Sequence, residues 1–242
     1  MSISTRTSIA WGPSFAHSEP TDTLVLTGRT YFVDQRLLKE DNTSAPKVVS
    51  WAFAGLRASE PVPGKPGFSK CSWTHLVSSV PFAKDENPAD EGVMQPHPDF
   101  PNDPEVALET GSMLNPDTGV VTEYEEVWRD KEPEAGSGVL FWEYGNDDTG
   151  PDNRGFLAVV ERYALGVGRV NGAFWTWRAV RSEEEEAGWR VEFEVDGGAG
   201  VRMGFKLLGI PSEKAVPEAT KVQEEGGGEA IWVCRESWKT SC

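Results

Sequence analysis

The sequence contains little of the chemistry that builds disulfides, metal sites or covalent active sites. Its 242 residues include only three histidines and three cysteines, the latter at Cys71, Cys234 and Cys242. An odd number of widely spaced cysteines favours free thiols in a reducing compartment over a disulfide framework. No Walker loop, HExxH, CxxC or GxSxG motif occurs. We therefore expect neither a metal ion nor a cofactor.

Long apolar runs and an excess of positive charge are also absent. The N-terminal segment MSISTRTSIAWGPSF lacks the apolar core of a secretory leader, and no stretch is long and apolar enough to cross a bilayer. The formal net charge is -16, and such a field repels phosphate backbones and anionic lipid headgroups. We therefore expect a cytoplasmic protein with no nucleic-acid partner and no membrane insertion. A basic protein or a neutral small molecule fits this charge better.

What the sequence does contain is a series of short apolar segments that alternate with period two. The gaps between them are rich in Gly, Pro, Asn and Asp, and no segment of helix length shows a 3.6-residue apolar stripe. This pattern predicts an all-β sandwich or barrel. The charged segment RDKEPEAGSG at 129–138 predicts a domain junction, with domains at 1–133 and 134–242 of roughly six strands or more each.

One hairpin can be predicted to the residue. Asn171-Gly172 separates RYALGVGRV from AFWTWRAVR, and this dipeptide is the strongest short-range signal for a type I′ hairpin. Such a turn places two glycines opposite two tryptophans, which leaves room for the indoles to lie across the partner strand. The predicted pairs are Val170 with Ala173, Gly168 with Trp175 and Gly166 with Trp177.

Alternation also predicts which side chains share a face of the segment KCSWTHLVSS. Cys71, Trp73, His75 and Val77 fall on one face, with Ser72, Thr74 and Ser78 on the other. Cys71 and His75 are too far apart on a strand to act as nucleophile and base. His75 is then either a hydrogen-bonded residue of a barrel wall or a polar group in an apolar pocket.

The segment VVTEYEEVWR carries three acidic residues on its two faces. Tyr124, Glu126 and Trp128 share one face, while Glu123 and Glu125 share the other. One face must be solvated, so at most one of these sets can contribute a buried carboxylate, whose pKa burial would raise. The alternative is a charged surface face.

The apolar run VVSWAFAGL at 48–56 places Trp51 and Phe53 on one face with a small alanine between them. The run is either an ordinary core strand or the lining of a cavity. Its core, WAFAG, resembles a hallmark of the fungal HRI proteins, a family named for interaction with a yeast casein-kinase-I-type kinase. The resemblance covers most of residues 2–133, continuing through 19–21 (EPT), 33–39 (VDQRLLK), 90–92 (DEG), 109–111 (ETG) and 124–130 (YEEVWRD).

The resemblance implies two lipocalin-like antiparallel β-barrels in tandem, at 1–133 and 134–242. It also implies association with that kinase and with the protein-translocation machinery, and no established catalysis. The second half matches mainly in the order of its strands. A fold of this type hosts many functions, so the resemblance supplies no catalytic residues.

Three functions are compatible with these observations. The first is a non-catalytic protein that binds a small hydrophobic molecule or a protein partner. The second is a cofactor-free cyclase or isomerase of the pericyclase, Diels–Alder type, which would hold a terpenoid or polyketide of fungal natural-product biosynthesis in a reactive shape. The third is a structural dimerisation module, and the sequence does not decide whether the protein is an enzyme.

The residues proposed for a site are aromatic, with two hydrogen-bond donors among them. His75 and Tyr124 are the candidate donors that could polarise a carbonyl in a catalytic reading. The proposed ligand wall consists of Trp51, Phe53, Trp73, Trp128, Trp175 and Trp177.

Overall fold

The computed structural model describes residues 1–39, 47–80, 89–115, 117–185, 188–195, 207–208, 218–223 and 229–240. Strands dominate these residues, and the all-β prediction is confirmed. No helix among them combines the length and apolarity needed to cross a bilayer. The strands of the first half are β1 Ser2–Trp11, β2 Thr21–Thr27, β3 Tyr31–Leu38, β4 Val49–Pro61, β5 Ser69–Ser78, β6 Ala89–Pro96, β7 Val106–Leu114 and β8 Val121–Lys131.

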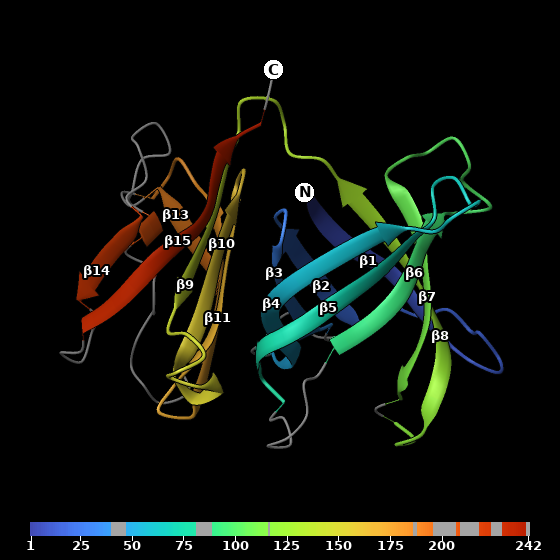
Figure 1. Cartoon of the computed structure of the whole chain (residues 1–242), viewed down its shortest axis with the longest axis horizontal. Helices are drawn as coiled ribbons and strands as arrows, with labels where there is room; N and C mark the ends of the chain where they lie inside the picture. The colour runs from blue at the N-terminus through green and yellow to red at the C-terminus, as the bar shows by residue number, and fades with distance from the viewer. Residues whose placement is uncertain are drawn as a thin grey trace.

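These eight strands form a closed antiparallel barrel in which each strand pairs with its neighbour in sequence. Closure is made by β1, which pairs with β2 on one side and with β8 on the other. One of the two predicted barrels is therefore present, with its axis running across the right half of Figure 1.

The second half forms a separate seven-stranded sheet in the order β13-β12-β11-β10-β9-β15-β14. Within the described residues this sheet is open, with β13 and β14 at its edges, so a second barrel stays a prediction. The chain passes from the barrel to the sheet over residues 132–137, and a division into two domains there also stays a prediction. The elements are β9 Gly138–Tyr144, a 3-10 helix Pro151–Asn153, β10 Arg154–Val160, β11 Tyr163–Val170, β12 Ala173–Arg181, β13 Trp189–Val195, β14 Ala219–Gln223 and β15 Glu229–Lys239.

Strand β4 has one face inside the barrel and the other against the second sheet, which lies beside it in Figure 1. Trp51 and Phe53 belong to the inner face, whereas Ala52 and Ala54 are fully buried against the sheet. The small alanines allow the two sheets to approach closely. The apolar cluster between barrel and sheet contains Ile3, Leu24, Leu26, Val33, Ala52, Ala54 and Val77 from the barrel and Val139, Phe141, Phe156, Ala158, Val160, Leu165 and Val167 from the sheet.

Buried polar contacts cross the same interface. Arg178 of β12 donates from Nε to the side-chain oxygen of Gln35 at 2.8 Å and from Nη1 to Asp22 at 3.0 Å. Gln35 in turn donates to the hydroxyl of Thr176 at 2.8 Å. Elsewhere, the Glu236 carboxylate accepts the backbone N–H groups of residues 29–31 at 2.8, 2.8 and 3.1 Å. These bonds fix how the sheet sits on the barrel.

The other face of the second sheet carries most of its tryptophans. The predicted hairpin is confirmed in full: Val170 pairs with Ala173, Gly168 with Trp175 and Gly166 with Trp177. A Cβ atom at Gly168 would lie 2.3 Å from the indole of Trp175. The glycines are therefore needed for the rings to lie flat across the partner strand. The resulting cluster includes Trp142, Trp175, Trp177, Trp189 and Trp232.

A bulge in β5 corrects one face assignment. Ala54 pairs with Val77, but the next residue of β4, Gly55, pairs with His75, which leaves Leu76 as an extra residue. Beyond the bulge the alternation is reversed, so Val77 packs against the second sheet. Ser78 instead accepts a hydrogen bond from the indole of Trp51 at 3.0 Å. The shared face predicted for His75 and Val77 is thus wrong, because a simple period of two cannot anticipate an inserted residue.

Candidate functional site in the barrel interior

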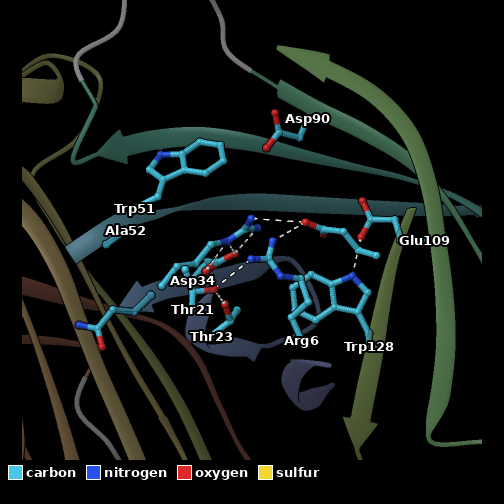
Figure 2. Close-up of polar contacts among 12 residues, drawn as sticks. Arg6, Thr21, Thr23, Asp34, Trp51, Ala52, Asp90, Glu109 and Trp128 are labelled. Atoms are coloured by element: carbon cyan, nitrogen blue, oxygen red, sulfur yellow. Dashed lines mark hydrogen bonds and ion pairs between the residues drawn. The ribbon is translucent and has the colours of Figure 1, made fainter. Parts of the chain in front are cut away.

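Two buried arginines organise the interior of the barrel. Arg6 of β1 donates to Glu126 of β8 at 2.5 Å and to Glu19 at 2.8 Å. Arg36 of β3 donates to Asp34 at 2.9 Å and lies 3.6 Å from Glu126. Burial opposes the charge on Arg36, but the Asp34 and Glu126 carboxylates outweigh it and raise its pKa. Figure 2 shows Arg6 and Asp34 at the centre of this network.

A further buried carboxyl group, Glu109 of β7, belongs to the same interior. It accepts hydrogen bonds from the hydroxyl of Tyr124 at 2.6 Å and from the indole N–H of Trp128 at 3.0 Å. Burial raises the pKa of Glu109 to about 8, the negative charge of Glu126 adds to this, and the two hydrogen bonds oppose it. Glu109 therefore carries a proton at neutral pH. Burial, reinforced by Glu109, also raises the pKa of the Tyr124 hydroxyl.

Two glycines make room for this group. Gly92 of β6 pairs with Gly111 of β7, and Gly111 pairs with Tyr124 of β8. A Cβ atom at Gly111 would lie 2.7 Å from the Tyr124 hydroxyl, and one at Gly92 would lie 2.7 Å from a Glu109 carboxyl oxygen. Both contacts are closer than real side chains tolerate. The positions of Tyr124 and Glu109 thus depend on the absence of side chains on the neighbouring strands.

Aromatic rings cover the other side of the arginine network. Phe53 packs on Trp51 and on His75, with ring centroids 4.3 and 4.2 Å apart. The guanidinium of Arg36 lies over the rings of Trp51 and Phe53, 5.2 and 5.4 Å from their centroids. His75 is buried, with its Nε2 3.2 Å from a carboxyl oxygen of Asp90. The interior already combines a cation, carboxylates and π faces within one space.

A cavity of about 80 Å³ remains among these side chains. It is lined by Asp34, Arg36, Glu109 and Glu126 and by rings that include Trp73 and Trp128. A larger hollow of about 510 Å³ lies at the end of the barrel between the β4–β5 and β6–β7 loops. We call this hollow the mouth. Arg57, Met94 and Asp130 line both the cavity and the mouth, so the two spaces are neighbours separated by these side chains.

The structure brings together part of the predicted site. Phe53, Trp73, Tyr124 and Trp128 all line the cavity. Trp51 and His75 lie in the barrel beside Phe53 but are not part of the cavity wall. Trp175 and Trp177 do not join them, because they belong to the cluster on the second sheet. Within the described residues, no three His, Cys, Asp or Glu side chains are grouped so that they could hold a metal ion.

The face assignment in β8 agrees with the structure, and it locates the buried carboxylate. Tyr124, Glu126 and Trp128 are buried, whereas Glu123 is exposed and Glu125 half-buried. Sequence reasoning did not identify Arg6, Asp34, Arg36 or Glu109 as site residues. A usable signal was present in the segment VDQRLL, where Asp and Arg two apart share a face between apolar neighbours.

The fold and the interior define a class of protein: a closed eight-stranded barrel with a charged, partly hollow interior, joined to a second antiparallel sheet. The chain belongs to the HRI1 family, because the model of that family, described as Protein HRI1, matches residues 2–239. A crystal structure of the uncharacterized protein YLR301w from Saccharomyces cerevisiae has the same fold, with a TM-score of 0.64 and 15% identity over 98% of each chain. No curated protein matches the sequence significantly.

The stretches that carry the sequence resemblance meet inside the barrel. Each contributes at least one residue to the charged network, the rings beside it or the cavity wall: Glu19, Asp34, Arg36, Trp51, Phe53, Asp90, Glu109, Tyr124, Glu126 and Trp128. Those stretches are far apart in the sequence but converge on one space. The barrel interior is therefore the candidate functional site.

Proposed function

We propose that this chain is a non-catalytic binding protein whose barrel takes up a small molecule through the mouth. The observation that carries the proposal is the cavity itself, because its wall combines aromatic rings with buried polar groups and shares Arg57, Met94 and Asp130 with the mouth. Concave sites with apolar walls and a few convergent polar groups are the usual form of small-molecule sites.

The dimensions indicate how a ligand would sit. Sites for drug-sized molecules measure about 300–1,000 Å³, whereas the inner cavity measures about 80 Å³ and the mouth about 510 Å³. A ligand would therefore place one end in the cavity and the rest in the mouth. The rings of Phe53, Trp73 and Trp128 suit the hydrophobic ligand expected from the sequence, and the carboxyl groups among them suit a ligand that also has polar atoms.

The test is to close the passage between the two spaces. Met94→Trp places a large ring at a residue that lines both. Leu114→Trp is the matched control, because Leu114 is exposed at the opposite end of β7. Equilibrium dialysis against a metabolite extract, read by mass spectrometry, should show compounds retained by the native protein and by Leu114→Trp but not by Met94→Trp. Retention of the same compounds by all three proteins, or by none, would refute the proposal.

A second candidate is the cofactor-free cyclase or isomerase, and one observation favours it. Glu109 holds a proton at neutral pH, because its pKa is about 8, and lines the cavity together with Tyr124. Such a pair could donate hydrogen bonds to a carbonyl oxygen of a substrate. The cavity of about 80 Å³ is small for a folded polyene, which is why binding ranks first. If the coding gene lies beside polyketide or terpene synthase genes, its deletion should accumulate an uncyclised precursor, and an unchanged metabolite profile would exclude this candidate.

A protein partner would use a different part of the molecule. The resemblance implies a casein-kinase-I-type kinase as a partner, and the net charge of -16 favours a basic contact surface on any such protein. Binding of that kinase should be the same for the native protein and for Met94→Trp. A loss in that variant would show that the mouth, and not the outer surface, receives the partner.

A further inference from the structure

The cavity wall contains more acidic than basic side chains. Among the residues that the structure describes, five acidic side chains and two basic ones, Arg36 and Arg57, line it. Arg6 lies behind the wall and donates to Glu126. It also donates to Glu19, which lies outside the wall, so Arg6 and Glu19 together add no net charge. The acids of the wall are Asp34, Asp90, Glu109, Glu126 and Asp130, so acidic groups outnumber basic ones even with Glu109 counted as protonated.

The same wall offers the aromatic surfaces that attract cations. Phe32, Phe53, Trp73, Tyr124 and Trp128 line the cavity. The faces of such rings are negative, and an ammonium or guanidinium group within about 6 Å of a ring centroid is attracted to them. Arg36 already makes this interaction with the rings of Trp51 and Phe53, at 5.2 and 5.4 Å from their centroids.

We propose that the barrel selects ligands whose leading group is an alkyl ammonium cation, held in the cavity between the acidic groups and the rings. This inference rests on the proposed binding function and names its ligand class. An anionic head would meet the surplus of acids, and the guanidinium groups of Arg6 and Arg36 are already engaged by Glu19, Glu126 and Asp34. A wholly apolar head would make no charge interaction with the acidic groups of the wall.

The mouth determines the rest of the ligand. Its wall is mixed in polarity, and its apolar part includes Pro96, Pro101, Pro104 and Ala107 beside Met94. Asp130 and Arg57 both stand where the cavity borders the mouth, so the acidic groups that would attract a cation lie deeper in the cavity. A short alkyl chain attached to the ammonium group would therefore lie along the apolar part of the mouth.

Binding of a cation should release a proton from the site. Glu109 of β7 faces Tyr124 and Glu126 of β8 and Arg36 of β3, and Asp90 is the acidic residue of β6 in the same wall. In the empty cavity Glu109 is protonated, and an ammonium group beside it favours the ionised form. At about pH 7, the amine should therefore displace close to one proton per molecule bound.

The test compares three ligands of one shape and different charge: hexylamine, 1-hexanol and hexanoate. Titration calorimetry at about pH 7 in phosphate and in Tris, two buffers with different ionisation enthalpies, reports affinity and proton release together. We expect hexylamine to bind at least about tenfold more tightly than the other two, with proton release that Glu109→Gln abolishes. Met94→Trp should remove the binding, and Ala107→Leu, a smaller change in the mouth, should weaken it.

The other outcomes separate this inference from the proposed function. If 1-hexanol or hexanoate binds as tightly as hexylamine and Met94→Trp blocks it, the cation is wrong and the binding site stands. If hexylamine binds equally to Met94→Trp and its affinity falls steeply with salt, it binds the acidic outer surface, and the inference is overturned. If none of the three binds while the metabolite dialysis still distinguishes Met94→Trp, the ammonium class is again excluded.

Discussion

Replacing Glu109 by glutamine should remove a loss of stability that the native protein suffers as the pH rises. The pKa of Glu109 is about 8 in the folded protein and 4.5 for the ordinary group. Between these values the folded state binds a proton that the unfolded state has released, so the free energy of unfolding falls as the pH rises through the folded pKa. From pH 6 to pH 9 this loss amounts to at most about 3 kcal/mol for one group with this pKa.

Glutamine is a close mimic of the protonated side chain. Its oxygen can accept the indole N–H of Trp128, and its amide can donate to the Tyr124 oxygen, which reverses the hydrogen bond that the Tyr124 hydroxyl donates to Glu109. Urea unfolding followed by tryptophan fluorescence should give similar stabilities for the native protein and Glu109→Gln at pH 6. At pH 9 the variant should be more stable. Because every other group titrates in both proteins, a difference between them that is the same at both pH values would refute the raised pKa.

Three further predictions concern the second sheet and its attachment. Gly168→Ala should lower the free energy of unfolding, measured in urea, by about 1–3 kcal/mol, because the new Cβ would lie 2.3 Å from the Trp175 ring. An unchanged urea midpoint would show that the ring can move. Arg178→Met should lower the free energy of unfolding by about 2–4 kcal/mol, because it leaves buried acceptors unpaired. Calorimetry should show a lower melting temperature than that of the native protein. Equal melting temperatures would contradict the role given to this contact. Glu236→Ala should free the backbone N–H groups of 29–31 and speed their hydrogen exchange, with unchanged exchange arguing against the contact.

Local patterns predicted the all-β class because many segments alternate with period two and are separated by turn residues. The Asn171-Gly172 hairpin was predictable to the residue since both turn residues adopt positive φ, at 49° and 80°. The bulge at Leu76 was not predictable, because nothing in KCSWTHLVSS marks an inserted residue. The sequence also could not show that Ala52 and Ala54 face another sheet, since burial on both sides of a strand depends on long-range packing.

The sequence indicated the aromatic residues of the candidate site but not its charged residues. Aromatic residues at alternating positions indicated Phe53 and Trp128, and both of these rings line the cavity. Charged residues on a strand are far more often solvated than buried, and sequence alone cannot show that Arg36 and Asp34 meet inside a barrel. Trp175 was misplaced for a related reason: its ring lies on a sheet face whose partner is set by the tertiary fold.

Because β4 is shared between the barrel wall and the contact with the second sheet, the first half of the chain is ill suited to being produced alone. Cutting after residue 133 would leave Ala52, Ala54 and the apolar side chains around them facing water. Such a fragment should self-associate or precipitate. Any study of the cavity therefore requires the intact polypeptide, and a mutation in the second sheet can alter the barrel wall through β4.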